Sequence, residues 1–412
     1  MLDFRQRRAR RAVVIGGSMS GLFCAALLRR DGWVVDVFER SPVELAGRGA
    51  GITVHPELIA ALARAGANTA GLGVEVQTRI VLDREGNIVH RHPTPETLTS
   101  WDRLQRTLRA LVPDEHYHLG ETFAGFTQSA NGATVQFQSG RSEMADLLIG
   151  ADGFRSSVRA QLLPGLVPDY AGYVVWRGAP QEAELPPSVL GSIFPHFTMY
   201  LPPRQQVIGY PIAGFDDDIR PGHRRYNFIW YRVVDAAALA DLCTDREGRT
   251  HSFSIPPPLI RDDVVQAMRR DAAGVMPHVF LQVLARIGKP FFTPIYDMVA
   301  PQMAFGCVAL VGDAASVTRP HMGFGVSKAA DDAMVLAAAL AEVPDVATGL
   351  ARFNGNRQPV AEQIYRHGRK LGAYFDVDIE SDALRRIGQR LRQPEVLACH
   401  LAVPHFLANA EI

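Results

Sequence analysis

A glycine-rich segment near the start of the chain has residue types suited to binding a phosphorylated ligand. In the sequence GGSMSG at 16–21, Gly16 allows a tight turn and Gly21 allows a helix to lie close to a sheet. A helix that begins at this turn directs its free N–H groups and its partial positive charge at a pyrophosphate. Ser18 occupies the position of the second glycine in the usual fingerprint, and its hydroxyl can donate a hydrogen bond there. Glu39, about 20 residues further on, is placed to accept hydrogen bonds from both hydroxyls of an adenosine ribose.

Two later segments carry further groups of this kind. The segment GADGFRSSVR at 150–159 follows an apolar stretch; by itself, its Asp-Gly pair indicates a turn, and Arg155 and Arg159 indicate a solvated helix face. The segment GDAASVTRPHMGFG at 312–325 also follows an apolar stretch. Its carboxylate Asp313 can accept hydrogen bonds from a chain of sugar-like hydroxyls, and its glycine-rich end directs the N–H groups of the next helix at an anion. A reduced flavin, with negative charge at N1 and at the C2 oxygen, has these requirements.

The patterns around these segments predict the elements that position them. Residues 11–40 read as strand, turn, helix and strand, with Gly32 as a natural helix stop. Such a βαβ unit implies a parallel sheet with the helix on one face. Residues 307–311 form another apolar strand, and residues 326–340 place their apolar side chains on one face of a helix.

A different pattern in the middle of the chain predicts a second domain. Residues 80–91 alternate around a Gly-Asn turn, which is typical of a hairpin. Residues 170–234 contain several strands rich in aromatic side chains, which indicate an antiparallel sheet. Residues 262–287 are predicted to be helical with two breaks, and the rest of the chain is predicted to be helical with an interruption at Pro359.

Composition argues against several other classes of protein. At 412 residues the chain can bury two or three cores, and its 43 basic and 43 acidic side chains cancel, which argues against nucleic acid or a membrane as a partner. The arginine-rich residues 5–11 are interpreted as a solvated tail rather than an export signal, so a cytoplasmic location is expected. The four cysteines lack C-x-x-C spacing, so no metal site is expected, and the thiols are expected to be buried and reduced. No apolar run reaches the roughly 18 residues of a membrane-spanning helix.

The order of the three segments resembles the single-component FAD-dependent aromatic hydroxylases of the para-hydroxybenzoate hydroxylase type. GGSMSG with Glu39, GADGFRSSVR and GDAASVTRPHMGFG carry this resemblance across most of the chain. The middle section, with GYVVWRG at 172–178 and NFIWY at 227–231, is most similar to the branch that contains 2,6-dihydroxypyridine 3-hydroxylase. The resemblance implies a mixed α/β fold, in which a Rossmann-like FAD-binding domain has an inserted antiparallel-sheet substrate domain and a helical C-terminus. The implied boundaries are FAD-binding parts at 1–72, 95–168 and 291–342, a substrate-domain hairpin at 73–94, a substrate domain at 169–290 and a helical segment at 343–412.

The resemblance also implies which positions hold a non-covalently bound FAD. Many relatives carry an arginine where this chain has Trp101, which leaves any FAD contact from Arg103 or Gln105 open. The ADP half would be held by Gly16, Gly17, Ser18, Met19, Ser20, Gly21, Glu39 and Arg40. The rest of FAD would be contacted by Arg48, Gly49, Asp152, Arg155, Gly312, Asp313, Pro320, Gly323, Gly325 and Val326. Of these, Asp152 and Arg155 in the second segment would also contact the nicotinamide nucleotide.

The activity implied by the resemblance is that of a monooxygenase. In this family NADH or NADPH reduces the flavin, O2 adds at flavin C4a, and the resulting hydroperoxide hydroxylates an electron-rich ring. The substrate would be a small aromatic or N-heteroaromatic molecule of the hydroxypyridine type. His321 and Tyr210 are the catalytic candidates, and Trp176 and His196 are candidates for the substrate wall, although packing alone would also explain all four.

Other functions stay open at this point. Within flavoenzymes, epoxidation or Baeyer–Villiger oxidation of a larger metabolite is the alternative. An NAD-dependent dehydrogenase shares the βαβ start but does not need the segment at 312–325. A FAD-fold binding protein without catalysis would show no substrate-stimulated NAD(P)H oxidation. The choice between NADH and NADPH and the oligomeric state, with a homodimer as one option, are also open.

Overall fold

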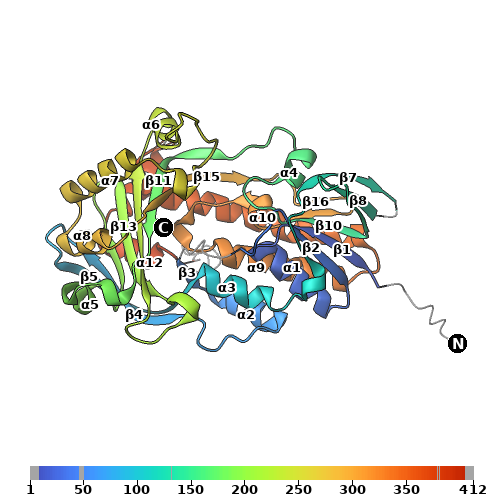
Figure 1. Cartoon of the computed structure of the whole chain (residues 1–412), viewed down its shortest axis with the longest axis horizontal. Coiled ribbons are helices and arrows are strands. Elements are labelled where there is room, and N and C mark those ends of the chain that lie inside the picture. The colour runs from blue at the N-terminus through green and yellow to red at the C-terminus, as the bar shows by residue number, and fades with distance from the viewer. Residues whose placement is uncertain (1–8, 46–50, 131, 378, 380, 404–412) are drawn as a thin grey trace.

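The computed structural model describes residues 9–45, 51–130, 132–377, 379 and 381–403. The molecule is elongated, with one large β-sheet at each end (Figure 1). The six-stranded sheet lies toward the N-terminal side of the picture and the nine-stranded sheet lies at the opposite end. The long helix α10 (Val346–Gly372) runs between the two ends.

The six-stranded sheet is mostly parallel, as the βαβ pattern predicts. β1 pairs in parallel with β2 and β10, β10 with β17, and β2 with β6, whereas β16 is antiparallel to β17. Helices α1 (Met19–Arg30) and α9 (Gly325–Ala341) contact each other beside this sheet, and the strands β7, β8 and β9 form a small antiparallel sheet that contacts β1 and β10. In spatial order the strands are β16 (Ala304–Phe305), β17 (Val308–Leu310), β10 (Leu147–Gly150), β1 (Arg11–Ile15), β2 (Val34–Glu39) and β6 (Tyr117–Leu119), and the small sheet contains β7 (Phe123–Ser129), β8 (Gly132–Phe137) and β9 (Ser142–Ala145).

The nine-stranded sheet is antiparallel except for the parallel pair of β12 and β4. Its hairpin of β4 and β5 turns at residues 83–87, where Gly86 has a φ of 92° that suits glycine. The predicted hairpin therefore exists and joins this sheet. In spatial order the strands are β18 (Ser316–Val317), β15 (Phe291–Val299), β11 (Asp169–Gly178), β14 (Arg225–Val233), β13 (Gln205–Ile212), β12 (Phe197–Tyr200), β4 (Val74–Leu82), β5 (Ile88–Ser100) and β3 (Gly51–Val54).

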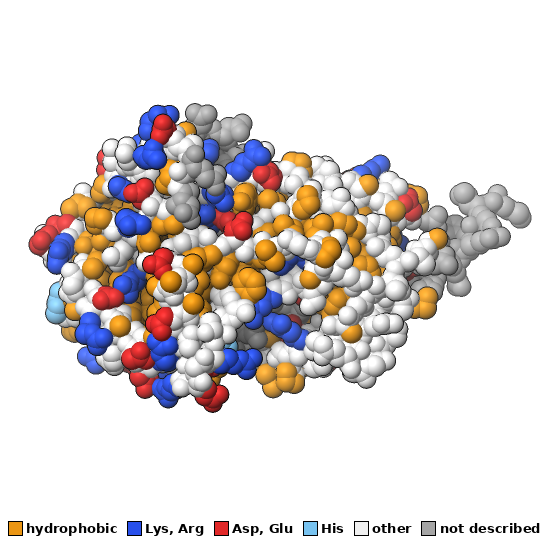
Figure 2. Space-filling model, turned by 90° about the horizontal axis from the view of Figure 1, so that it is seen from above, with side chains coloured by type: hydrophobic (Ala, Val, Ile, Leu, Met, Phe, Trp, Pro, Cys, Tyr) orange, Lys and Arg blue, Asp and Glu red, His pale blue; other side chains and the backbone are white. Residues whose placement is uncertain are grey.

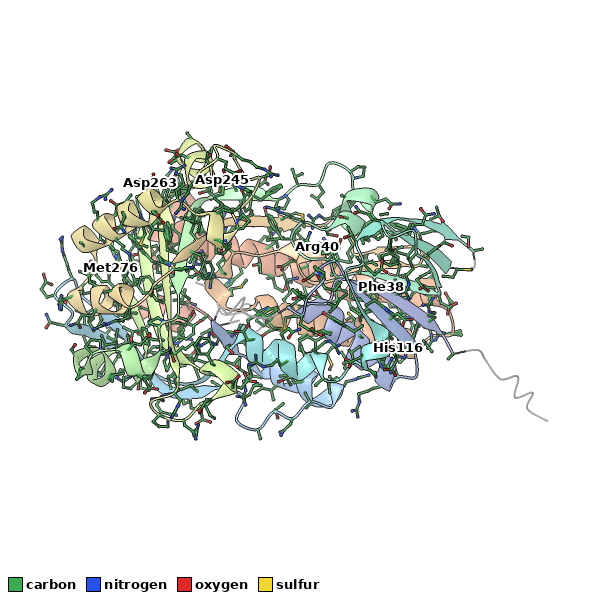
Figure 3. All side chains as sticks on the ribbon, in the orientation of Figure 1. Phe38, Arg40, His116, Asp245, Asp263 and Met276 are labelled. Atoms are coloured by element: carbon green, nitrogen blue, oxygen red, sulfur yellow. The ribbon has the colours of Figure 1, made fainter. Side chains whose placement is uncertain are left out.

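The two faces of this sheet bury different side chains, because alternate residues of a strand point to opposite faces. On the outer face, Trp176 and Trp230 pack in a core with residues of α7 (Asp262–Val275) and α8 (His278–Ala285). On the inner face, Tyr173, Tyr210 and Tyr231 pack in a second core with Phe324 and Phe375. Figure 3 shows Asp263 and Met276 at the outer side, on and just after α7, whereas Phe38 lies in β2 of the other sheet and Arg40 directly follows that strand. The inner face is thus the one turned toward the six-stranded sheet.

The C-terminal part is helical, but the interruption predicted at Pro359 is wrong. Pro359 lies inside the single helix α10, which has 27 residues. A proline frees the carbonyl four residues earlier, here that of Gly355, and both residues are exposed, so that water can hydrate the freed carbonyl. The remaining helices are α2 (Pro56–Ala65), α3 (Trp101–Arg109), α4 (Ser157–Leu162), α5 (Pro187–Ser192), α6 (Ala236–Leu242), α11 (Asp382–Arg390) and α12 (Pro394–His400).

Several general expectations can be compared with the structure. The predicted mixed α/β class is confirmed, whereas the domain boundaries stay a prediction. Cys24 and Cys243 are buried as expected, but Cys307 and Cys399 are only half-buried. In the part of the chain that the structure describes, no helix is long and apolar enough to cross a membrane. Basic and acidic side chains are interspersed over the end that carries the nine-stranded sheet (Figure 2), in keeping with the zero net charge.

Candidate cofactor site

The three glycine-containing segments meet at one edge of the six-stranded sheet. Strands β17, β10, β1 and β2 run parallel, so their carboxyl ends lie side by side. Backbone hydrogen bonds continue past the strands, from the N–H of Gly16 to the carbonyl of Phe38 at 2.9 Å and from the N–H of Val311 to the carbonyl of Gly150 at 3.0 Å. Glu39 and the segment that contains Asp313 therefore follow strands at the same edge. Ligands of open α/β sheets bind outside this edge.

The glycines of the first segment are required by close backbone contacts. Gly16 has a φ of 107°, and a Cβ atom there would lie 2.3 Å from the carbonyl oxygen of Ala151. A Cβ atom on Gly21 would lie 1.9 Å from the carbonyl oxygen of Gly16. No side chain fits at either place without moving the backbone, so glycine keeps the turn tight and the helix close to the sheet.

Helix α1 presents an uncapped N-terminus at this turn. Its N-cap residue Ser18 makes no side-chain hydrogen bond to the helix, and the first turn contains no acidic residue. Arg29 and Arg30 lie in the last turn, where they complement the negative end of the helix dipole. The free N–H groups and positive end of this 12-residue helix are thus available to an anion such as a pyrophosphate.

Glu39 is held in place by the backbone. Its Oε2 accepts a hydrogen bond from the N–H of Gly17 at 2.9 Å, and its Oε1 accepts one from the N–H of Ser41 at 2.9 Å. The hydroxyl of Tyr117 donates to the carbonyl of Gly17 at 2.9 Å and fixes the turn from the other side. Each carboxylate oxygen has a further lone pair. Glu39 is therefore oriented in advance and keeps acceptor capacity for the predicted ribose contact.

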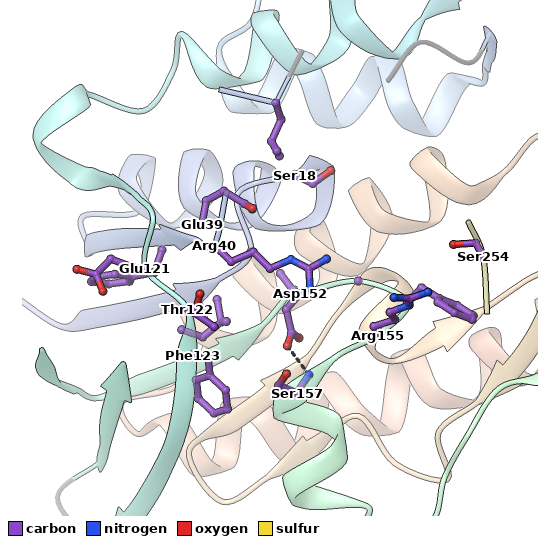
Figure 4. Close-up of a pocket in the computed structure, with 17 residues that line it drawn as sticks. Ser18, Glu39, Arg40, Glu121, Thr122, Phe123, Asp152, Arg155, Ser157 and Ser254 are labelled. Carbon is purple, nitrogen blue, oxygen red and sulfur yellow. Dashed lines mark hydrogen bonds between the residues drawn. The ribbon is translucent and has the colours of Figure 1, made fainter. Parts of the chain in front are cut away.

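A cavity of about 440 Å³ lies beside the first and second segments (Figure 4). Figure 4 shows Arg40 extending across this cavity toward Asp152. Asp152 caps α4, because its Oδ2 accepts from the N–H of Ser157 at 2.7 Å and its Oδ1 accepts from the hydroxyl of Ser156. Burial raises the pKa of Asp152, and these hydrogen bonds oppose that rise. The lining includes Gly16, Ser18, Glu39 and Arg40 of the first segment and Asp152, Gly153, Arg155 and Ser157 of the second.

The two arginines of the second segment have different surroundings. Arg155 is exposed at the cavity, donates to the carbonyl of Ser252 and lies over the ring of Phe253. Arg159 is only 4% exposed, so the interpretation of its place as a solvated helix face is wrong. Its guanidinium donates to the carbonyls of Phe154 at 2.7 Å, Ala314 at 3.1 Å and Asp313 at 3.3 Å. Arg159 therefore ties the second segment to the third.

The carboxylate of Asp313 reaches solvent in spite of its deep position. Its side chain is exposed to solvent. The surrounding protein nevertheless removes enough water to raise the pKa of Asp313, while the charges of Lys328 and Arg159 act to lower that pKa. Among the described residues no hydrogen bond to this carboxylate is present, whereas its backbone carbonyl is bound by Arg159. An accessible carboxylate inside the molecule suits a ligand with hydroxyl groups, as the ribityl chain of FAD has.

Beneath Asp313 lies a buried ionic network that the sequence interpretation missed. Asp332 is 0% exposed and accepts from the N–H of Gly312 at 2.8 Å and from Arg357 at 2.7 and 2.9 Å. Lys328, also 0% exposed, donates to the carbonyl of Gly312 at 2.9 Å. Lys328 and Asp332 lie four residues apart within a mostly apolar helix. This spacing of opposite charges was the available sequence signal for the network. Their partner Arg357 lies 25 residues further on, which local periodicity does not show.

The start of α9 faces the space between the two sheets. Gly323 ends the preceding turn with a φ of 60°, and the first helical residues are the exposed Gly325 and the half-buried Val326, with no acidic residue in the first turn. Pro320 begins the turn. Arg48 and Gly49 lie outside the described residues, so their predicted contacts stay predictions.

His321, in the turn before α9, is buried in an aromatic cluster. Its Nε2 lies 2.7 Å from the hydroxyl of Tyr173, and its ring centroid is 5.3 Å from that of Phe375. Burial, together with the nearby charge of Arg319, lowers the pKa of His321 to about 3. The imidazole is therefore neutral at neutral pH.

Tyr210, one of the two catalytic candidates, lies on the inner face of the nine-stranded sheet. It stacks on Phe197 at 5.0 Å between ring centroids. Trp176 is buried on the outer face, 5.0 Å from Phe292, so the sheet separates it from Tyr210, and its place in the substrate wall stays a prediction. His196 is half-buried just before β12, where burial and Arg91 lower its pKa.

Two further polar side chains are those of Asn227 and Gln105. The sequence left a FAD contact from Gln105 open and gave no separate signal for Asn227. Asn227 pairs with Tyr210 across the strands and accepts from the N–H of Gly51 at 3.3 Å, while its Nδ2 has no hydrogen-bond partner in the described part of the chain. Gln105 of α3 is 4% exposed and its Nε2 likewise has no partner there, whereas Arg103 donates to the carbonyl of Asp217. Within the described residues, both amides keep a donor for a ligand.

These features together fit a dinucleotide cofactor. The glycine turn, the uncapped helix and the ordered Glu39 suit an ADP half, and the accessible Asp313 suits a polyol chain at the same sheet edge. The start of α9 adds a second set of free N–H groups near the second sheet. The fold and the site thus define a dinucleotide-binding flavoprotein that has a second, nine-stranded sheet.

Comparisons with known proteins give the family. Family models match residues 14–71 (NAD(P)-binding Rossmann-like domain), 170–297 (FAD binding domain-like) and 258–367 (FAD binding domain). The 2,6-dihydroxypyridine 3-monooxygenase of Paenarthrobacter nicotinovorans is 36% identical over 334 residues, which are 79% of this chain and 82% of that protein. The chain belongs to the family of FAD-dependent aromatic monooxygenases. It is a flavoenzyme with FAD as cofactor, and NADH or NADPH is the co-substrate typical of the family.

Solved structures agree with this assignment. The 2,6-dihydroxypyridine-3-hydroxylase from Arthrobacter nicotinovorans has a TM-score of 0.84 at 32% identity, covering 89% of this chain and 93% of that one. HpxO of Klebsiella pneumoniae, complexed with FAD and uric acid, has a TM-score of 0.76 at 23% identity and covers 97% of each chain. The second likeness concerns the fold alone.

Proposed function

We propose that this enzyme hydroxylates a small, electron-rich aromatic or N-heteroaromatic substrate of the hydroxypyridine type, with NAD(P)H and O2. The observation that carries the proposal is the 36% identity to a 2,6-dihydroxypyridine 3-monooxygenase over 79% of the chain. Aurachin C monooxygenase/isomerase and 3-amino-4-hydroxybenzoate 2-monooxygenase are less similar, at 29% and 28% identity. We place the FAD-binding part around the six-stranded sheet and the substrate part around the nine-stranded sheet.

We assign the FAD contacts to the carboxyl edge of the six-stranded sheet. When bound, FAD accepts a hydride from the reduced nicotinamide and, once reduced, activates O2 for transfer of one oxygen atom to the ring. The amides of α1 bind the pyrophosphate, Glu39 accepts from the ribose, and Asp313 accepts from the ribityl hydroxyls. The amides of Gly325 and Val326 at the start of α9 stabilise negative charge on the pyrimidine edge of the flavin.

The inner face of the nine-stranded sheet then holds the substrate ring against the flavin. Tyr210 presents an aromatic surface, and the Nδ2 of Asn227, which has no hydrogen-bond partner among the described residues, donates to a ring hydroxyl or carbonyl. The buried cluster of Tyr173, His321 and Phe375 excludes water beside the turn that precedes α9. His321 is neutral there, so it can donate or accept one hydrogen bond without carrying charge.

The test is a substrate panel with the purified holoenzyme. 2,6-Dihydroxypyridine, urate and 4-hydroxybenzoate are added separately, and oxidation of NADH and of NADPH is followed together with product formation. We expect the hydroxypyridine to give the largest stimulation, with one hydroxylated product per nicotinamide oxidised. Absence of stimulation by every compound, in protein that retains FAD, would contradict the proposal. The cytoplasmic location and the oligomeric state stay predictions, and size-exclusion chromatography tests the homodimer.

A further inference from the structure

We propose that the C-terminal segment 397–402 is a clasp that positions the flavin-facing start of α9, and that His55 is the positioning residue that joins the two. The inference rests on the proposed function, since it assumes that FAD contacts the start of α9. The contacts of the clasp and of His55 lie on both sides of the turn at 320–323.

The first contact is between the clasp and this turn. The N–H of Ala402 donates to the carbonyl of His321 at 2.7 Å. Gly323 is wedged between β3 and the clasp, because a Cβ atom there would lie 3.2 Å from Thr53 Oγ1 and 3.3 Å from Ala402 Cβ. Ala402 itself has a φ of 54°, a left-handed conformation that non-glycine residues adopt rarely and that surrounding contacts must hold.

His55 makes the second contact, and its two ring nitrogens face different elements. The residue is 4% exposed, with Nε2 3.1 Å from the carbonyl oxygen of Ala402 and Nδ1 3.0 Å from the hydroxyl of Ser327. A carbonyl can only accept, so Nε2 carries the proton. Burial lowers the pKa of His55 and keeps the ring neutral, so Nδ1 accepts from the Ser327 hydroxyl. A single tautomer of His55 therefore makes both hydrogen bonds, one to Ala402 of the clasp and one to Ser327 of α9.

Arg79 anchors the clasp to the nine-stranded sheet. It is 1% exposed on β4, forms an ion pair with Glu96, and donates to the carbonyl of Ala398 at 2.9 Å and to that of Leu401. These carbonyls lie at the end of α12, where the negative end of the helix dipole favours a cation. The chain of contacts therefore runs from the substrate-facing sheet through the clasp and His55 to Ser327.

Ser327 is the third residue of α9, so this chain of contacts ends in the first helical turn. The N–H groups of that turn must keep their direction if they are to contact the flavin. Loss of the link frees the turn, and FAD binding weakens. His55 acts through Ser327 and Ala402 and not by contact with the cofactor.

The test is FAD binding to apoprotein, measured by quenching of FAD fluorescence, for His55→Ala, Ser327→Ala and the double variant. We expect each single change to raise the Kd for FAD by roughly fivefold, the factor expected for one neutral hydrogen bond. The double variant should be no worse than the weaker-binding single variant, because both changes break the same link. His278→Ala, at an exposed histidine at the start of α8, is the matched control and should not change the Kd.

Thermal unfolding of the apoproteins separates positioning from general stability. If His55 and Ser327 were only core residues, apoprotein Tm would fall while the Kd for FAD of the folded fraction stayed within twofold of wild type, and the inference would be overturned. Fold-changes that multiply in the double variant would overturn it as well. If the wild type binds FAD but no substrate stimulates it, the proposed function fails while the titration still decides on the clasp.

Discussion

The buried network under Asp313 gives the sharpest test of how the cofactor edge is held together. Asp332 is 0% exposed and lies between two buried cations, Lys328 at 3.4 Å and Arg357 at 2.7 Å. Asp332→Asn keeps the shape and one acceptor but removes the charge that both cations face. Removal of one partner from a buried ion pair costs about 3–5 kcal/mol. We expect the apoprotein Tm to fall by roughly 3–6 °C, measured by calorimetry.

The matched control is Glu342→Gln, another change from acid to amide at an ion pair between the end of α9 and α10. Glu342 and its partner Arg352 are 67% and 49% exposed and lie 3.2 Å apart. An exposed pair of this kind contributes about 0–1 kcal/mol, so its loss should be nearly silent. The reasoning is refuted if Asp332→Asn is as stable as Glu342→Gln. FAD affinity should also fall in Asp332→Asn, because Asp332 holds the N–H of Gly312.

The same residue predicts a dependence on pH. Burial acts to raise the pKa of Asp332, but Lys328 and Arg357 outweigh it, and the pKa is lowered. The native state therefore holds this carboxylate ionised at a pH where the unfolded chain, with a pKa of about 3.9, is protonated. The stability difference between wild type and Asp332→Asn should be constant from about pH 5 to pH 8 and should shrink below about pH 4. A difference that grows on acidification contradicts the assignment.

Three other substitutions test the site at separate places. Gly16→Ala should lower FAD affinity at least tenfold in equilibrium titration, because its Cβ would lie 2.3 Å from a backbone oxygen, whereas Gly32→Ala, with no atom within 4 Å, should leave affinity unchanged. Tyr210→Leu, which removes the aromatic surface, should raise the substrate KM and leave the Kd for FAD unaltered; an altered Kd would place Tyr210 at the cofactor instead. His321→Ala should uncouple NADH oxidation from hydroxylation, seen as hydrogen peroxide in place of product, and unchanged coupling would remove His321 from the reaction.

The parts of the site that sequence reasoning found are those whose signal is local. Gly16 and Glu39 belong to one βαβ unit, and Asp313 directly follows a strand and precedes a glycine-rich helix start, so spacing alone predicts their place at a sheet edge. Arg159 and Asp332 were missed because the groups they bind are distant in sequence, at Asp313 and Arg357. A short local window cannot show such pairings.

The outcomes for Trp176 and Tyr210 show a different limit. Both lie in aromatic-rich strands, and alternation says only that neighbouring residues point to opposite faces. Which face is turned toward the cofactor depends on the helices that cover the other face, here α7 and α8, which follow in the chain. The bulk of Trp176 fits the helix-covered core, and residue type alone does not show which face such a side chain occupies.

Retention of FAD should therefore depend on nearly the whole chain rather than on the N-terminal βαβ unit. Glu39 and the α1 turn are local, but Asp313 reaches the same edge only through β17, and its turn is held by Arg159 and by the network of Asp332. The proposed clasp extends this dependence to Ala402. Each of these contacts orders a different part of one extended ligand. Loss of one contact therefore leaves the other contacts in place but no longer aligned with the rest of FAD. A fragment that contains only residues 9–168 should then bind ADP far better than it binds the flavin half of FAD. This view is refuted if the fragment binds FAD with the same affinity as the full chain does.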